Sequence, residues 1–237
     1  TISNFFTAPK FEETTTEPTE KPAGFFEVFA TFFKKPQIGV ALLFVLTYRL
    51  GESQLVKMAS PFLLDDLGVG GLAYSTEAVG TIYGTVGVIM LSLGGILGGI
   101  LISRDGLKKW MLPMLLSLNL PNALYAILAI TQTTSLYAVV GTVVIEQFGY
   151  GFGFAAFMMY LIYVAEGASK TSHYAIATGF MALGMMLPGM LSGYIQEWLG
   201  YDGFFIWVVI AALPAFFVLR YLKYPEDYGK KTAETND

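Results

Sequence analysis

The chain has 237 residues, of which 54% are hydrophobic and 14% are charged, whereas an average soluble protein carries about 25% charged residues. A mean hydropathy of +0.58 and a net charge of −4 exclude a chain that is disordered in bulk and a nucleic-acid-binding protein. With no cysteine and one histidine, disulfide scaffolds and thiolate or multi-histidine metal sites are excluded as well. The class that remains is an all-α, polytopic membrane protein.

Residues 1–36 are expected to form a polar connection. The run EETTTEPTEKPAG at 12–24 has no periodicity and is typical of a linker. The stretch FFEVFATFFKK at 25–35 is too short to cross a bilayer. Its composition suits an amphipathic helix on the membrane surface or, equally, an extension of the first span. The chain starts with Thr and has no signal peptide, so we expect it to begin inside a longer protein.

Six membrane spans follow. A spanning helix needs about 20 apolar residues, and windows of that kind are separated here by Pro, Gly, polar or charged clusters. They predict a bundle over 37–224, followed by a cytoplasmic tail at 225–237. The predicted spans one to six are residues 38–64, 76–102, 110–131, 136–165, 174–198 and 203–223.

The basic residues predict the orientation of these spans. Of the fourteen Lys and Arg residues, all but two fall before span one, in the turns after spans two and four, or after span six. The intervening turns, 65–77, 131–135 and 196–203, contain none. The positive-inside rule therefore puts both termini in the cytoplasm.

Span one contains a polar face at membrane depth, where charged side chains normally pair or line a water-filled path. At helical spacing this face comprises Tyr48, Arg49, Glu52, Ser53, Lys57 and Ser60. Arg49 and Glu52 are three residues apart and within reach of an ion pair, so mutual neutralisation against a neighbouring helix is the structural alternative to a solute site. Lys57 either lines the path or extends its ammonium group to the membrane surface. Gly51 and Pro61 make the helix easy to bend.

Span four contains Glu146 and Gln147, followed by FGYGFG at 148–153. Glu146 has no basic residue within one turn, so its partner is expected to be another helix, a proton or a solute. A carboxyl group of this kind suits proton coupling, and the alternative is a protonated carboxyl that bonds to a facing helix. The three glycines are expected to loosen the helix beside Glu146, as in the discontinuous helices of transporters.

Span two contains two GxxxG registers, 94–98 and 95–99, which allow close helix packing. Spans one to three and four to six also share features, since the first span of each triplet has a buried Glu near a glycine. This pattern predicts inverted three-plus-three repeats, the arrangement found within each half of major facilitator carriers.

The turn after span two, GGILISRDGLKKW at 98–110, resembles the facilitator loop motif G-x-x-x-D-R-x-G-R-R. Ser103 stands where the motif has Asp, and Asp105 follows Arg104 instead, whereas Arg104, Gly106, Lys108 and Lys109 fit. Three longer stretches, 48–68, 146–184 and 192–207, resemble the carboxy-terminal half of AmpG-type muropeptide permeases, in the family that includes acetyl-coenzyme A transporters.

This resemblance implies a twelve-span carrier in the bacterial inner membrane whose second half is this chain, with the amino-terminal six-helix half as its partner. It implies proton-driven import of anhydromuropeptides without a cofactor. From the residues themselves, we expect Arg49, Lys57, Gln147 and Tyr48 to contact solute, and Glu146 and Glu52 to take up protons.

Two alternatives remain at this point. The first is a carrier for another solute, such as a coenzyme A thioester, a sugar or a peptide. The second is a membrane-embedded signalling or assembly partner without transport. No enzyme motif is found, because the sequence lacks cysteine, has one histidine and has no acidic pair at a metal spacing.

Overall fold

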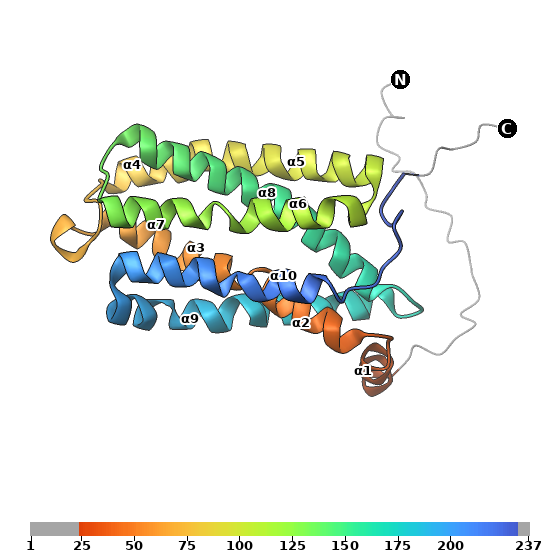
Figure 1. Cartoon of the computed structure of the whole chain (residues 1–237). Coiled ribbons are helices and arrows are strands. Elements are labelled where there is room, and N and C mark those ends of the chain that lie inside the picture. Colours follow the sequence, from red (N-terminus) through yellow and green to blue (C-terminus); the bar gives the residue numbers. More distant parts are fainter. Residues whose placement is uncertain (1–23, 232–237) are drawn as a thin grey trace, which may run out of the picture.

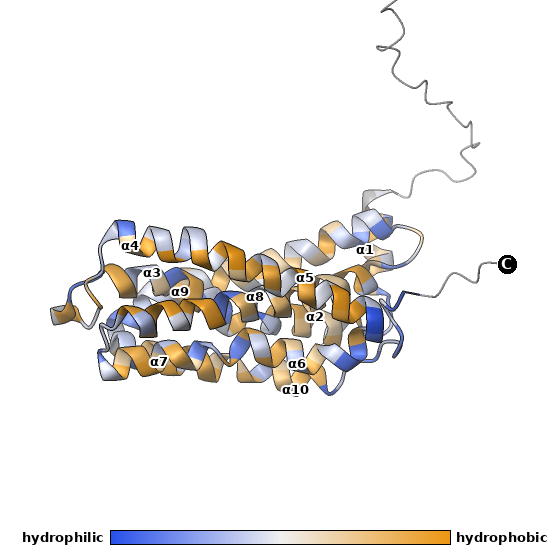
Figure 2. Ribbon diagram, turned by 90° about the horizontal axis from the view of Figure 1, so that it is seen from above, coloured by the Kyte–Doolittle hydropathy of each residue, from blue (hydrophilic) through white to orange (hydrophobic). Residues whose placement is uncertain are grey.

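A computed structural model of the chain describes residues 24–231, and within this range the chain forms helices and no strand. The predicted linker before residue 24 and the end of the predicted tail lie outside the described residues. Hydrophobic residues cover the length of the bundle, and hydrophilic ones gather at its two ends (Figure 2).

Span one is preceded by a short separate helix, α1 (Phe25–Phe33), and is itself broken into α2 (Ile38–Tyr48) and α3 (Leu50–Leu64). The chain bends by 91° between α1 and span one, so α1 does not extend that span. The break falls at Arg49, whose φ of −111° and ψ of 19° are not helical. The sequence predicts bending at Gly51 or Pro61, but both lie within α3.

Span two consists of α4 (Thr76–Thr81), a π-helical segment (Ile82–Gly87) and α5 (Val88–Asp105). Between spans one and two, a 3-10 turn at Leu67–Val69 forms part of the loop. Span three is α6 (Leu107–Asn119) followed by α7 (Asn122–Thr131), and Pro121 lies at the interruption. Proline has no N–H to donate, which favours a break at this position.

Span four is one continuous helix, α8 (Leu136–Ala165). Spans five and six are contained in α9 (Lys170–Ala211) and α10 (Leu213–Leu219). Within α9 the backbone turns at Gly200, with a φ of 71° and a ψ of 175°. There the chain reverses its direction, as Figure 1 shows at the left end of the bundle. Lys170–Leu219 therefore makes two passes, and the described chain forms six passes in all.

Glycines allow a close helix contact where α5 crosses α8. A Cβ atom at Gly94 would lie 2.9 Å from the Phe152 backbone nitrogen, and one at Gly98 would lie 3.0 Å from the Phe152 carbonyl oxygen. The 94–98 register is thus confirmed as a packing surface. A Cβ atom at Gly99 would meet nothing within 4 Å.

The glycines of α8 serve the same purpose. A Cβ at Gly151 would collide with the Leu91 carbonyl of α5, and one at Gly149 or Gly153 would collide with α6. The expectation that these glycines loosen the helix beside Glu146 is therefore wrong. They let α8 lie close to its neighbours, and α8 stays continuous.

The hydrophobic core consists of two clusters, one toward each end of the bundle. Along span one, the first cluster includes Phe44 and Tyr48, and the second begins at Leu55. Along span four, the second cluster includes Val143 and the first begins at Phe152. A layer between the clusters, which we call the middle layer, therefore contains residues 49–54 of span one and 144–151 of span four.

One end of the bundle, here called the basic end, carries the turn 104–109. After span six the chain does not leave this end at once. The amide of Leu107 donates to the Tyr228 carbonyl (2.8 Å), and the amide of Lys231 donates to the Ser103 carbonyl (2.8 Å). Residues 224–231 therefore form a strap across the turn between spans two and three. The helix α1 and the strap lie at the same end in Figure 1.

Candidate solute-binding and coupling site

The middle layer holds the ionisable residues that the sequence places at membrane depth. Arg49 is 4% exposed, Glu52 is 0% exposed and Glu146 is 2% exposed. Buried charges are retained when they are paired or when they function. The two core clusters above and below the layer isolate these groups from both ends of the described bundle.

Arg49 is held by aromatic and sulfur groups. One guanidinium nitrogen donates to the Tyr150 hydroxyl (2.6 Å), and another lies 2.8 Å from the sulfur of Met185. The guanidinium carbon lies 4.9 Å from the Tyr150 ring centroid and 5.2 Å from that of Phe154, the distances of cation–π contacts. Arg49 thus has no carboxylate partner within salt-bridge distance among the described residues.

Glu52 does not form the ion pair that its spacing from Arg49 predicts. Neither carboxyl oxygen of Glu52 has a hydrogen-bond partner among the described residues, and no salt bridge joins the two side chains. The turn between the two residues is intact, since the Ser53 amide donates to the Arg49 carbonyl (2.8 Å), but the Arg49 guanidinium is bound by Tyr150 and Met185 instead.

Glu146 is linked to a chain of polar groups. The Gln147 amide donates to both of its oxygens, at 3.1 and 3.0 Å, and the Tyr125 hydroxyl donates to one of them at 3.5 Å. The hydroxyls of Tyr125 and Tyr83 are in turn hydrogen-bonded. The alternative of a carboxyl bonded to a facing helix is therefore partly realised, because Tyr125 belongs to span three.

A cavity of about 240 Å³ opens beside this chain, between α3 and α8. Glu146, Gln147 and Tyr83 line it together with Ser60 of span one. One residue of the polar face of span one, Ser60, and the polar pair of span four thus lie at one cavity. Its size suits part of a solute or several water molecules, since a pocket for a whole small molecule measures about 300–1,000 Å³.

Two predicted solute contacts lie elsewhere. Tyr48 is fully buried, and its hydroxyl donates to the Gly153 carbonyl (2.8 Å) while its ring stacks on Phe157. Lys57 is exposed, and the carbons of its side chain pass Gly189 of span five. In this conformation Tyr48 joins two spans, and Lys57 lies outside the middle layer.

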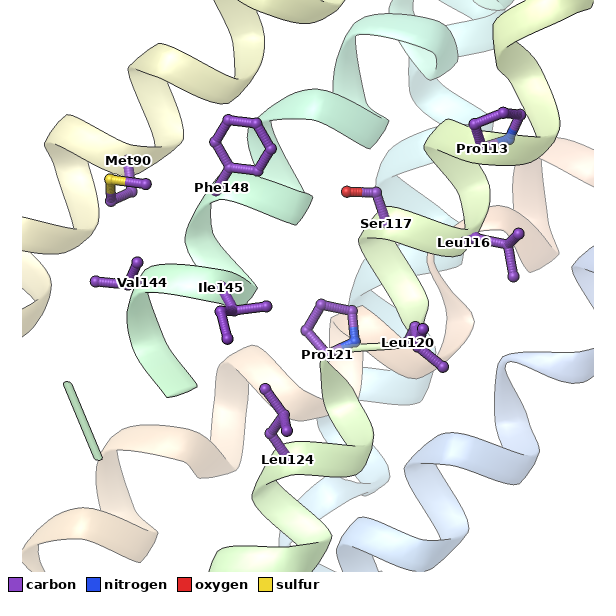
Figure 3. A pocket seen from close by; sticks show the side chains of 10 residues that line it. All are labelled: Met90, Pro113, Leu116, Ser117, Leu120, Pro121, Leu124, Val144, Ile145 and Phe148. Atoms are coloured by element: carbon purple, nitrogen blue, oxygen red, sulfur yellow. The ribbon is translucent and has the colours of Figure 1, made fainter. Parts of the chain in front are cut away.

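A larger groove of about 690 Å³ opens on the other side of α8, and Figure 3 shows its lining. Ile145 and Phe148 of α8 face it, beside Pro121 and Leu124 of span three. Ser117 supplies the one side-chain hydroxyl in this lining, and no ionisable group is part of it. A polar solute would find few partners there, so the better candidate site is the cavity on the Glu146 side of the helix.

The loop motif at the basic end is arranged around Asp105. Its carboxylate accepts from Arg104 (2.9 Å) and the Trp110 indole (2.9 Å) and lies 3.2 Å from the Lys109 ammonium. Asp105 thus binds two basic residues of the turn, Arg104 and Lys109, although Ser103 occupies the place of the motif's Asp. Gly106 has a φ of 90° and packs on the strap, and Lys108 pairs with Glu226 of the strap (2.7 Å).

The sequence reasoning missed the tyrosines and asparagines of the middle layer. Tyr83, Tyr125 and Tyr150 make the polar contacts of Glu146 and Arg49, and Asn122 is fully buried beside Gly51. Each of these residues is a polar side chain within an otherwise apolar span, and that is the signal by which the sequence could have indicated them.

Comparison with known proteins decides the family. The sequence profile described as "Major Facilitator Superfamily" matches residues 42–237, which is most of the chain. The chain belongs to the Major Facilitator Superfamily. Members of this superfamily are transporters, so the chain is an integral membrane protein of a transporter family, in line with its apolar helices.

Among curated members of the superfamily, the chain is similar to AmpG-type proteins. It is 29% identical over 194 residues to "Putative transporter AmpG 4" of Rickettsia conorii, covering 82% of this chain and 45% of that protein. It is 26% identical over 199 residues to "Anhydromuropeptide permease" of Escherichia coli K12, covering 84% of this chain and 39% of that protein. The chain therefore spans less than half the length of these relatives, and its resemblance to AmpG-type carriers is confirmed.

Proposed function

We propose that the chain is the carboxy-terminal half of a proton-coupled secondary transporter that imports anhydromuropeptides by alternating access. The amino-terminal six-helix half would be its partner, in keeping with the fraction of each relative that the chain matches. The observation that carries the proposal is the middle layer, which holds two buried carboxyl groups and a buried guanidinium, and in which one of the carboxyl groups, Glu146, lines a cavity.

The solute class is supported by the name of one relative, "Anhydromuropeptide permease", and by the chemistry of Arg49. A muropeptide carries carboxylates, sugar hydroxyls and amides. A guanidinium that has no carboxylate partner within the described chain is suited to a solute carboxylate, with which it forms strong charge-assisted hydrogen bonds. Gln147 and Tyr83 supply neutral partners for hydroxyls and amides at the cavity beside Glu146.

The coupling residue in this proposal is Glu146, assisted by Glu52. Protonation neutralises a buried carboxylate and lowers the cost of moving it through an apolar environment. Glu146 lines the cavity and connects through Tyr125 to Tyr83, so a proton that arrives from the cavity reaches it through hydroxyl groups. The basic end would face the cytoplasm of a bacterial cell, with both termini on that side of the inner membrane.

The deciding experiment is uptake of radiolabelled anhydromuropeptide by cells that lack their own permease and express the full-length transporter. We expect accumulation against a gradient that a protonophore abolishes. The matched control is a cell that expresses the Arg49→Ala variant at the same level in the membrane. Absence of uptake with the protein present in the membrane would refute the solute and direct the search to coenzyme A thioesters, sugars and peptides.

A further inference from the structure

Two buried ionisable side chains of the middle layer keep atoms without a hydrogen-bond partner among the described residues. These atoms are the Nε of Arg49 and both carboxyl oxygens of Glu52. Arg49 and Glu52 are both buried, so solvent does not satisfy them. Buried groups of this kind are strongly unfavourable when unpaired, and native proteins nearly always satisfy them. Their opposite charges suggest that the two side chains satisfy each other in a second arrangement.

The two side chains belong to one turn of span one. They are three residues apart, and the Ser53 amide donates to the Arg49 carbonyl (2.8 Å), so the helical turn that contains both is formed. Residues at this spacing are neighbours on the helix surface, with Cβ atoms about 5–6 Å apart. The guanidinium attracts the Glu52 carboxylate, although no salt bridge joins them. At this spacing, a change of rotamer brings the two groups together without movement of the backbone.

In the structure, the Arg49 guanidinium is held by two neutral groups, the Tyr150 hydroxyl (2.6 Å) and the Met185 sulfur (2.8 Å). A thioether is a weak acceptor, and neither group brings a charge that neutralises the guanidinium. Tyr150 of span four and Met185 of span five are both partly exposed, whereas Glu52 is fully enclosed. A solute can therefore approach Arg49 in this position but cannot reach Glu52.

The charges of the middle layer favour a second position of Arg49. In the proposed function Glu146 carries a proton, and Arg49 and Glu52 are then the ionised side chains of the layer, one of each sign. When they are apart, each leaves an uncompensated charge in an apolar environment, and when they pair, the layer is neutral. A solute carboxylate offers the guanidinium the same neutralisation. The two carboxylates therefore compete for one guanidinium.

We propose that Glu52 is the internal competitor of the solute for Arg49. The guanidinium binds a solute carboxylate at the position beside Tyr150 and Met185, and it pairs with Glu52 when the solute has left. Glu52 is thus a positioning residue, which acts through Arg49 and does not touch the solute. This inference rests on the proposed function, because it needs a solute that carries a carboxylate. The pair neutralises the middle layer of the empty carrier before the carrier reorients.

The pairing is tested without solute by a double-mutant cycle on the purified full-length transporter in detergent at neutral pH. Arg49→Gln and Glu52→Gln each leave one buried charge without its partner, so each should lower the thermal unfolding midpoint. The double variant removes both charges, and we expect it to lose clearly less than the sum of the two single variants. The matched cycle combines Arg49→Gln with Glu146→Gln, which removes the other buried carboxyl of the layer, and should be additive.

The competition is tested by equilibrium binding of radiolabelled anhydromuropeptide to the same proteins. Glu52→Gln removes the competitor, so we expect the dissociation constant to fall about tenfold, the effect of roughly one charge-assisted hydrogen bond. Ser192→Ala removes a buried hydroxyl that is bonded within α9 and should leave the constant unchanged. A residue that only supported the fold, or that bound the solute itself, would weaken binding when replaced.

Two results would overturn the competitor role of Glu52. One is an additive Arg49–Glu52 cycle, and the other is a dissociation constant that Glu52→Gln leaves unchanged or raises. Failure of the proposed function gives a different pattern. The unmodified transporter would then bind no anhydromuropeptide, whereas the cycle measured without solute would still show the coupling between Arg49 and Glu52.

Discussion

Glu146 and Glu52 share a layer but differ in their surroundings. Glu146 accepts bonds from Gln147 and Tyr125 beside a cavity, whereas Glu52 has no hydrogen-bond partner among the described residues. A group that gains and loses a proton in each cycle needs a route to solvent, and Glu146 has the hydroxyl chain for it. This difference supports Glu146 as the main coupling residue of the proposed function.

The substitution Glu146→Gln keeps the shape of the side chain and removes its titration. We expect accumulation driven by a pH gradient to fall to the level of equilibration, while exchange of labelled for unlabelled solute continues, because exchange needs no net proton movement. Both rates are measured in proteoliposomes with and without an imposed pH gradient. Equal loss of exchange and accumulation would show that Glu146 serves binding and not coupling.

At the scale of helices, the turn between spans two and three is fastened to the strap by the Lys108–Glu226 ion pair. The ammonium of Lys108, by hydrogen bond and charge, lowers the pKa of the Glu226 carboxyl below its ordinary value. The pair therefore contributes fully above the ordinary glutamate pKa of about 4.3 and is lost as the pH falls through the lowered value.

Hydrogen exchange of the Leu107 amide, which donates to Tyr228, reports on this contact. We expect the protection of this amide, corrected for the intrinsic exchange rate, to be constant near neutral pH. Below pH 4 it should fall about two- to fivefold, which corresponds to the small free energy of an exposed ion pair. In the Glu226→Gln variant, the Leu107 amide at pH 7 should already have the lower protection that the unmodified protein shows below pH 4. If its protection equals that of the unmodified protein at neutral pH, the backbone bonds alone hold the strap.

The α5–α8 crossing gives a second prediction at this scale. Gly94→Val places a branched side chain against the backbone of Phe148 and Phe152, so we expect the free energy of unfolding to fall by about 1–3 kcal/mol. Gly99→Val, one turn further along the same helix, faces open space and is the matched control. Denaturant titration of the purified variants compares them, and similar losses would contradict a packing role for Gly94.

Over the whole molecule, apolar windows and basic residues are enough to predict six passes and a basic end. Besides the expected loosening of α8 by its glycines, two further predictions failed for physical reasons. The break of span one falls at Arg49 and not at Gly51, because Gly51 is used for contact with Val208 and Ala212 of span six. The Arg49–Glu52 pair does not form, because Tyr150 and Met185, from two other spans, take the guanidinium. Contacts between segments far apart in the sequence decide where span one breaks and which groups bind Arg49. The spacing of residues along a single helix carries no information about such contacts.

The orientation of the whole bundle is testable because the chain has no cysteine, so a single introduced cysteine is the only thiol. Ser135 lies in the turn between spans three and four, at the end opposite to Lys230. We expect a membrane-impermeant maleimide to label Ser135→Cys in intact cells and Lys230→Cys only after permeabilisation. The reverse pattern would place the basic end outside the cytoplasm.

The π-helical segment Ile82–Gly87 sets the rotational phase of span two. A π turn accommodates one more residue than an α turn, and each residue of an α-helix turns the chain by about 100°. If the segment were α-helical with the same number of residues, the Gly94–Gly98 contact with α8 would stay in place but everything before the segment would be rotated by about that angle. Tyr83 would then turn away from Tyr125. The extra residue thus works as a fixed angular offset, which lets a single helix present glycines to α8 at one level and a hydroxyl to Tyr125 at another.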